Sequence, residues 1–361
     1  MNPHIENVVM QFDLPDGAWT AEPYGNGHIN ETYLVTTGEK RFILQRVNGY
    51  VFPKPEDVMD NIERVTAFLK VQIEREGGDP ARETLTLVKT HQGECFTYDR
   101  EGGLWRMYLF VEDTVSYDLP DTPALFELSG EAFGKFQRQM GGFPADSLHE
   151  TIHDFHNTPA RYRQLEDAIA RNEAGRLGSV AAEIEFCRQY EREVHALLDA
   201  MEAGEIPLRV THNDTKLNNV LIDDLTGAGC CVIDLDTVMP GLPHYDFGDM
   251  VRTGTSPAAE DETDLDKVVM RFPMYEALLR GYLQGAGSFL SPVEKSWLPF
   301  SGKLITLEIG IRFLTDYLEG DVYFKVRRPG HNLDRCRTQL KLVASIESQF
   351  DAMRRLADTL R

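Results

Sequence analysis

The sequence predicts an α+β protein with two lobes, a small β-rich N-lobe followed by a larger, mainly helical C-lobe. Its 361 residues are enough for two domains with cores of their own. Residues 1–112 hold short β-branched and aromatic runs separated by turn glycines, with one helical stretch among them. Residues 113–361 instead show apolar residues at helical spacing over several long segments. We therefore expect a domain boundary at residue 112.

The predicted N-lobe is an antiparallel sheet that carries one helix. The helix is expected over 53–70, where Val58, Ile62 and Val65 share one face. Turn glycines such as Gly38 between β-rich runs are typical of a meander. The expected strands are 18–24, 32–36, 41–47, 85–89, 95–98 and 105–111.

The predicted C-lobe is helical apart from a few short strands. Its helices are expected over 123–140, 160–174, 179–202, 264–284, 293–317 and 332–357. Its strands are expected at 208–210, 219–223 and 230–235. These strands flank the polar residues that carry the functional argument.

Composition narrows the classes of partner. The net charge of −21 argues against nucleic acid or an anionic membrane surface, and would suit a cationic substrate. No segment has the apolar length of a membrane span, and residues 1–13 lack a signal-peptide core. The five cysteines have no metal-binding spacing, which favours reduced thiols. We expect a cytoplasmic, soluble protein.

The most informative motif is the run THNDTKLNN at 211–219. His212, Asp214 and Asn219 have the spacing H-x-D-x-x-x-x-N, in which the aspartate accepts a proton from an attacking hydroxyl. We therefore expect Asp214 to be a catalytic base in phosphoryl transfer. Lys216 could place its ammonium group on the γ-phosphate of ATP. His212 is expected to hold the loop in shape.

A candidate magnesium site follows this motif. The apolar strand at 230–233 ends in Asp234, and Asn219 and Asp234 offer the hard oxygen ligands that Mg²⁺ prefers. Asp236 is a candidate for a second metal or an indirect contact. Downstream, the triplet at 246–248 spells the kinase D-F-G motif, but a Pro-Gly loop precedes it. We therefore expect Asp246 to brace the catalytic loop, and ATP and Mg²⁺ to be the co-substrate and the cofactor.

A glycine-rich stretch at 25–30 lies between two expected strands, which favours a hairpin over ATP phosphates and disfavours a Rossmann turn. Gly25, Gly27 and Asn30 are candidate nucleotide-binding residues, and His28 could reach either phosphate or acceptor. The lysine that kinases carry on the third strand is missing, and Gln45 occupies the inward position. The missing lysine leaves open a nucleotide-binding protein without turnover.

A competing metal motif occurs at 149–153. His149, Glu150 and His153 match H-E-x-x-H, which on a helix binds zinc with the glutamate activating water. Pro159 shortens any helix here, which favours a polar connection. A zinc hydrolase is therefore the alternative from a different enzyme class.

With these residues in hand, the chain resembles the aminoglycoside phosphotransferase-like superfamily, which is protein-kinase-like. Within it, the chain is most similar to bacterial N-acetylhexosamine 1-kinases. The stretches that carry the resemblance are EPYGNGHINETYLV (22–35), THNDTKLNNVLID (211–223), VIDLDTVMPG (232–241), DFGDMVR (246–252) and IRFLTDYLEGDVYF (311–324).

The resemblance implies a protein-kinase-like fold and ATP- and Mg²⁺-dependent phosphorylation of the anomeric hydroxyl of N-acetylglucosamine or N-acetylgalactosamine. It places the sugar against Asp214, His28, Arg312 and Tyr323. The forked donor of Arg312 and the hydroxyl of Tyr323 suit sugar oxygens or an amide carbonyl. Gln45 also matches this branch. Another small-molecule kinase, for an aminoglycoside, choline or an amino alcohol, is the alternative within the class.

Overall fold

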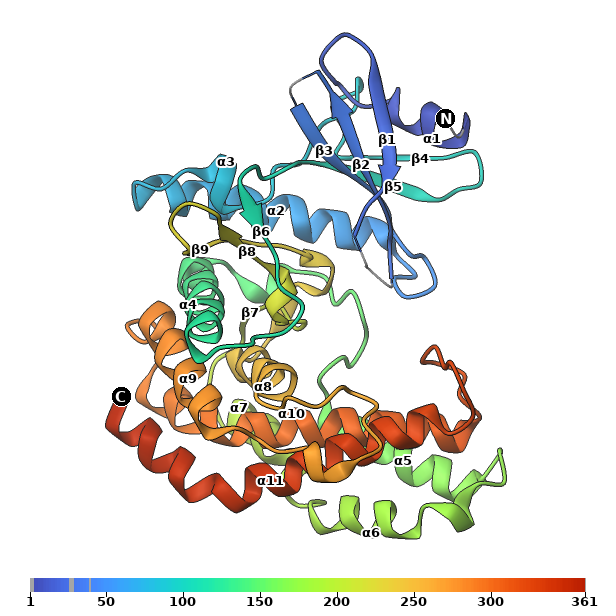
Figure 1. The fold of residues 1–361 in the computed structure, drawn as a ribbon, viewed down its shortest axis with the longest axis vertical. Helices are drawn as coiled ribbons and strands as arrows, with labels where there is room; N and C mark the ends of the chain where they lie inside the picture. The colour runs from blue at the N-terminus through green and yellow to red at the C-terminus, as the bar shows by residue number, and fades with distance from the viewer. Residues whose placement is uncertain (1–2, 26–28, 39, 361) are drawn as a thin grey trace. The chain divides into compact units, whose positions relative to one another are not determined.

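The computed structural model describes residues 3–25, 29–38 and 40–360, which divide into two compact units (Figure 1). The sheet unit comprises Met1–Val115, Gly142–His153 and Val220–Pro240, and the helical unit comprises Ser116–Gly141, Asp154–Asn219 and Gly241–Arg361. A small antiparallel sheet in one unit and a larger set of helices in the other confirm the predicted α+β fold class. The units interleave along the chain, and the contiguous division after residue 112 stays a prediction.

The main sheet has five antiparallel strands in the order β1-β2-β3-β5-β4. On the central strands, Gln45 pairs with Thr32 on one side and with Arg106 on the other. The expected strand at 85–89 is absent, because this segment makes only an isolated bridge from Leu87 to Tyr108. The strands are β1 (Trp19–Pro23), β2 (Glu31–Thr37), β3 (Lys40–Arg46), β4 (Phe96–Tyr98) and β5 (Leu104–Leu109).

The sheet unit contains three helices and a second, smaller sheet. Helix α1 was not predicted, because it is too short for a clear helical period; its Ile5, Val8 and Val9 pack against Leu44 and Trp105 of the main sheet. The remaining elements are α1 (Pro3–Val9), α2 (Pro55–Arg75), α3 (Pro80–Glu83), and the antiparallel strands β6 (Thr114–Val115), β8 (Val220–Asp223) and β9 (Gly229–Val232).

A buried asparagine joins three segments of the sheet unit. Asn61 of α2 accepts a hydrogen bond from the backbone N–H of His149 (2.9 Å) and donates to the carbonyl oxygens of His149 (2.8 Å) and Val238 (2.9 Å). Buried backbone groups need such partners. This side chain therefore ties the segments around 149 and 238 to helix α2.

The helical unit contains most of the helices expected from the sequence. The segment 179–202 is an exception, since it breaks into two helices around a 3-10 turn at Glu193–His195. Its elements are α4 (Pro123–Gln139), α5 (Thr158–Arg171), α6 (Ala181–Gln189), α7 (Ala196–Glu202), β7 (Arg209–Thr211), α8 (Pro243–Gly254), α9 (Phe272–Ala286), α10 (Pro292–Glu319) and α11 (His331–Leu360); a strand β10 spans Met239–Gly241.

Helix α8 was not predicted, because Gly248 and Gly254 lower its helical propensity. The structure gives Gly248 a packing role. A Cβ atom there would lie 2.6 Å from the carbonyl oxygen of Ser301 on α10, so only glycine allows this approach of the two helices. The close packing of α8 and α10 supports the residues described below.

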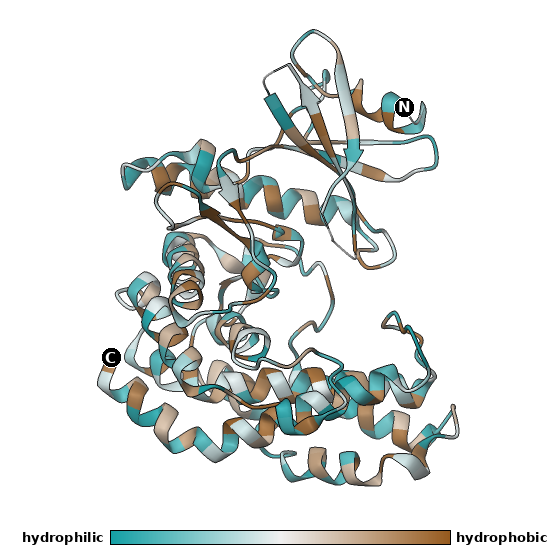
Figure 2. Cartoon of the chain, viewed as in Figure 1, coloured by the Kyte–Doolittle hydropathy of each residue, from teal (hydrophilic) through white to brown (hydrophobic). Residues whose placement is uncertain are grey.

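Figure 2 shows hydrophobic and hydrophilic residues alternating along α11, as expected for helices with one buried side. Over residues 3–25, 29–38 and 40–360, none of the helices is both long enough and apolar enough to span a bilayer. All five cysteines are free thiols.

Candidate active site

A buried carboxylate fixes the backbone of the catalytic-loop motif in the helical unit. Asp246, in the first turn of α8, accepts hydrogen bonds from the backbone N–H groups of His212 (3.0 Å) and Asn213 (2.7 Å) and from Nε2 of Gln137 (2.6 Å). Burial raises the pKa of Asp246, although His212 and these donors oppose that rise. The contacts agree with a bracing role for Asp246, which stays a prediction.

The imidazole of His212 is buried and lies edge-on to the rings of Phe133 and Phe136, with centroids 5.3 Å and 6.1 Å away. Its Nδ1 accepts a hydrogen bond from the backbone N–H of Asp214 (3.3 Å). Asn213 between them has a φ of 65°, so the chain turns sharply here. The ring of His212 is thus placed to support this turn.

Helix α8 supplies a second carboxylate that the sequence analysis missed. Oδ2 of Asp249 accepts the backbone N–H of Thr215 (3.0 Å), and its Oδ1 accepts Nε of Arg252 (2.9 Å). Asp246 and Asp249 lie one turn apart, so both face the same loop. The spacing D-x-x-D could have indicated this pair if the helix had been recognised.

Asp214 itself is partly exposed and forms an ion pair with Lys216, whose Nζ lies 2.6 Å from Oδ1. Burial alone would raise the pKa of Asp214, but the ammonium of Lys216 holds it below its usual value. The side chain of Asn219 donates to the backbone carbonyl of Asp214 (2.8 Å). Since the amide nitrogen of Asn219 is used, a metal would bind through its Oδ1.

The candidate metal residues Asp234 and Asp236 differ in their surroundings in the sheet unit. Asp234 is exposed and has a left-handed backbone, with a φ of 61°. Asp236 is buried; its Oδ1 lies 2.5 Å from Nη1 of Arg106, and its Oδ2 accepts Nδ2 of Asn30 (2.7 Å). Both oxygens of Asp236 have protein partners, so this geometry favours Asp234 over Asp236 as a metal ligand. These contacts agree with the indirect role expected for Asp236, and metal binding by it stays a prediction.

Two of the glycine-rich loop residues, Gly27 and His28, lie outside the described residues. Gly25 has a φ of 76°, a conformation that favours glycine. Asn30 donates to Asp236 as described, and its Oδ1 accepts the backbone N–H of Asn48 (3.0 Å). Both the nitrogen and the oxygen of the Asn30 side chain therefore have protein partners.

Gln45, at the inward position of β3, contacts Arg106, a residue that was not predicted to belong to the site. Oε1 of Gln45 accepts two hydrogen bonds from the guanidinium of Arg106, from Nε (3.1 Å) and Nη2 (2.9 Å). Arg106 is only 1% exposed, although it is charged. A lone arginine inside the apolar run LWRMYLF at 104–110 is the signal that could have identified it.

Arg312 and Tyr323, the candidate acceptor residues, lie near each other in the helical unit. The guanidinium carbon of Arg312 lies 5.8 Å from the ring centroid of Tyr323, 5.2 Å from that of Phe155 and 5.6 Å from that of Phe324. A second cation, Arg161, donates to the backbone carbonyl of Phe155 (3.4 Å). Burial and the charge of Arg312 lower the pKa of Arg161.

The loop that carries Tyr323 is held by Asp316 of α10. The Asp316 carboxylate accepts the backbone N–H groups of Val322 (2.9 Å), Tyr323 (2.7 Å) and Phe324 (3.0 Å). Asn332 of α11 donates a further hydrogen bond to it (2.7 Å). This carboxylate was also missed, because its contacts depend on a loop that follows the helix.

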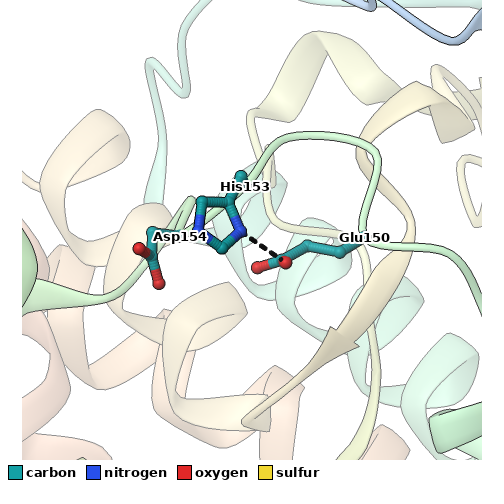
Figure 3. A group of neighbouring side chains, drawn as sticks. All are labelled: Glu150, His153 and Asp154. Carbon is teal, nitrogen blue, oxygen red and sulfur yellow. Dashed lines mark hydrogen bonds and ion pairs between the residues drawn. The ribbon is translucent and has the colours of Figure 1, made fainter.

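The H-E-x-x-H residues do not lie on a helix, so the two imidazoles do not share the helical face that a zinc hydrolase needs. Nε2 of His149 lies 3.0 Å from Oδ2 of Asp60, whereas Nδ1 of His153 lies 2.9 Å from Oε2 of Glu150. Figure 3 shows the pair of Glu150 and His153 with Asp154, the next residue. This arrangement does not support the zinc-hydrolase alternative.

The contacts of Asp246 predict the effect of removing its carboxylate. Asp246→Ala would leave the N–H groups of His212 and Asn213 and the amide of Gln137 without their acceptor. We expect the free energy of unfolding to fall by about 3 kcal/mol or more, since each buried unpaired donor costs roughly 1–3 kcal/mol. Urea denaturation measures this change. The exposed Asp167→Ala is the control, and equal stability of the two variants would contradict the bracing role.

Solved structures with the same fold include several phosphotransferases. A microcompartment-associated aminopropanol kinase is 18% identical with a TM-score of 0.66, covering 97% of this chain and 98% of its own. An aminoglycoside phosphotransferase from Alicyclobacillus acidocaldarius is 13% identical with a TM-score of 0.58, covering 98% and 96%. The GDP complex of aminoglycoside 2′-phosphotransferase-IIIa is 14% identical with a TM-score of 0.55, covering 94% and 99%. At these identities the likeness shows the fold.

Sequence comparison gives the family directly. Residues 20–289 match the phosphotransferase enzyme family, APH. The matched region holds the glycine-rich loop, the catalytic-loop motif and the strand-terminal Asp234. Because the match spans most of the chain, this protein belongs to the APH phosphotransferase family and is a small-molecule kinase.

Proposed function

We propose that this kinase transfers the γ-phosphoryl group of ATP to the anomeric hydroxyl of an N-acetylhexosamine, N-acetylglucosamine or N-acetylgalactosamine, and releases the sugar 1-phosphate. The family gives the phosphoryl transfer. The resemblance of the stretches around Asp214, Arg312 and Tyr323 to N-acetylhexosamine 1-kinases supports the acceptor. A similar fold holds GDP, which supports a nucleotide donor. The free cysteines suit a cytoplasmic enzyme.

In the proposed reaction, Asp214 orients the acceptor hydroxyl and takes its proton as the phosphoryl group moves to that oxygen. The anomeric hydroxyl is more acidic than other sugar hydroxyls, because the ring oxygen withdraws electron density, so a weak carboxylate base suits it. Lys216 contributes a positive charge for the γ-phosphate.

The donor groups of Asn219 and Asp234, one amide oxygen and one exposed carboxylate, fit Mg²⁺. We propose these two residues as its ligands. When bound, Mg²⁺ neutralises charge on the phosphates.

The observation that carries the choice of acceptor is the pair of cations in the helical unit. Arg312 and Arg161 both contact the segment at Phe155, since the guanidinium carbon of Arg312 lies 5.2 Å from the Phe155 ring centroid and Arg161 donates to the Phe155 carbonyl (3.4 Å). The carboxylate of Glu308 nearby is already engaged by His156 (2.8 Å) and Thr158 (2.6 Å). Like charges at a binding site disfavour a ligand strongly. An acceptor with an ammonium group therefore fits less well than one with a neutral acetamide.

This charge argument separates the proposal from its main alternative. Aminopropanol and aminoglycosides, the substrates named for similar folds, carry ammonium groups at neutral pH. The rings of Phe155, Tyr323 and Phe324 lie around Arg312. Apolar surface with a few polar groups is common where small molecules bind. The acetamide carbonyl can accept from Arg312 while its methyl group contacts a ring.

The role of Asp214 predicts a large loss of turnover without loss of nucleotide binding. Asp214→Asn keeps the shape of the side chain but removes its basicity. We expect kcat to fall by about 10²–10⁴-fold, the usual contribution of a general base, with the Kd of ATP little changed. Steady-state kinetics and calorimetry measure the two quantities. Turnover near that of the wild type would remove Asp214 from this role.

The ion pair with Lys216 predicts a shift in pH dependence. Lys216 lowers the pKa of Asp214, and Asp214 acts as a base only when ionised. In Lys216→Met the pKa of Asp214 should rise, so the acid limb of the kcat/KM profile should move to higher pH. The exposed Lys70→Met should leave that limb in place. An unchanged acid limb in Lys216→Met, at whatever rate, would contradict the assignment.

The acceptor proposal predicts discrimination by charge. Wild-type kcat/KM should be higher for N-acetylglucosamine than for glucosamine or ethanolamine. Arg312→Met should reduce kcat/KM for N-acetylglucosamine by roughly 1–3 kcal/mol of lost hydrogen bonding, with the KM of ATP little changed. The variant should also lower the ratio of kcat/KM for N-acetylglucosamine to that for glucosamine, because the positive charge that repels the ammonium group of glucosamine is removed. Tyr323→Phe removes only a hydroxyl group, so it should reduce kcat/KM for N-acetylglucosamine less than Arg312→Met does. A preference of the wild type for ethanolamine would refute the proposal.

A further inference from the structure

The sheet unit buries an arginine at a position where a charge is costly. Arg106 lies on β5, between β3 and β4, and its side chain is 1% exposed. Removing a charged group from water is unfavourable unless paired groups compensate it. No assigned role accounts for this residue, although it occupies the place in the sheet beside the missing lysine.

The guanidinium of Arg106 is held by two partners on different segments. It donates two hydrogen bonds to Oε1 of Gln45, at 3.1 Å and 2.9 Å, and Nε2 of Gln45 donates in turn to Oγ1 of Thr32 (3.2 Å). Its Nη1 lies 2.5 Å from Oδ1 of Asp236. The planar fork of arginine can serve both partners at once, which the single ammonium of a lysine cannot do.

Asp236 is thereby fixed from three directions. Besides Arg106, its Oδ2 accepts Nδ2 of Asn30 at the end of the glycine-rich loop (2.7 Å). Its backbone carbonyl accepts Oγ1 of Thr151 (3.0 Å). These contacts immobilise the turn at Leu235–Thr237, which begins directly after Asp234.

Asp234 depends on that turn for its direction. Its left-handed backbone, with a φ of 61°, is a conformation that aspartate tolerates better than most residues, and it sets the direction in which the chain enters the turn. Asp234 is the residue from which the turn at Leu235–Thr237 starts, so the position of its backbone depends on that turn, which Asp236 holds.

We propose that Arg106 is a positioning residue that acts through Asp236 to orient Asp234 for Mg²⁺, in place of the lysine that β3 lacks. The inference rests on the proposed metal role of Asp234. Because Arg106 is buried, it acts through its partner and does not touch the phosphates. Gln45 serves as the second anchor of the guanidinium.

The test compares ADP binding with Mg²⁺ and with EDTA, measured by isothermal titration calorimetry, so that no acceptor is needed. Wild type should bind ADP more tightly with Mg²⁺. We call the ratio of the ADP Kd in EDTA to the ADP Kd in Mg²⁺ the gain. In Arg106→Met this gain should shrink at least tenfold or vanish, while the Kd of ADP in EDTA changes less than threefold. Arg106→Lys keeps the positive charge but loses the planar, two-sided donor of the guanidinium, so it should lose part of the gain. This variant replaces Arg106→Met in the test if Arg106→Met does not fold.

Two comparisons make the test specific. Arg41→Met removes a different arginine of the main sheet, on β3, which pairs with Glu112, and this variant should keep the wild-type gain. The double variant Arg106→Met/Asp236→Asn should lose no more of the gain than Arg106→Met, and should melt at a higher temperature, because no unpaired carboxylate remains.

Each other result counts against the inference in a distinct way. A folded Arg106→Met that keeps the wild-type gain would overturn it. Equal loss of ADP binding with and without Mg²⁺ would also overturn it, by indicating direct phosphate contact or general disruption. A wild type with no gain from Mg²⁺ would instead refute the metal assignment of Asp234 on which the inference rests.

Discussion

We propose that the arrangement of the catalytic-loop motif depends on one buried carboxylate, that of Asp246. It accepts the backbone N–H groups of His212 and Asn213, and those two residues fix where Asp214 stands. The turn passes through Asn213, which has a left-handed backbone and is buried, and buried backbone N–H groups need such an acceptor. Helix α8 carries this carboxylate in its first turn. Its close packing on α10 at Gly248 keeps the carboxylate in place.

The same principle recurs at other candidate site residues that the structure describes. Asp249 holds Thr215, Asp316 holds the backbone around Tyr323, and Asp236 holds the end of the glycine-rich loop through Asn30. Each is a carboxylate with several N–H donors, and such charge-assisted hydrogen bonds are stronger than neutral ones.

The sequence was sufficient for the fold class and for most helices, because these follow from periodicity; the catalytic role of the motif at 211–219 stays a prediction. It was insufficient where function depends on contacts between distant segments. Arg106 could not be assigned, since its partners Gln45 and Asp236 are far apart in the chain. Helix α8 was missed, because its glycines serve packing against a helix that comes later. For the match to H-E-x-x-H, Pro159 already favoured a polar connection, and the segment forms no helix.

The central claim is that phosphate goes to the anomeric oxygen of an N-acetylhexosamine. The most direct measurement is ³¹P NMR of the product made from ATP, Mg²⁺ and N-acetylglucosamine. The account predicts a phosphomonoester signal coupled to the sugar proton H1. A signal coupled to H6, or no sugar phosphate while ethanolamine or an aminoglycoside is phosphorylated under the same conditions, would contradict it.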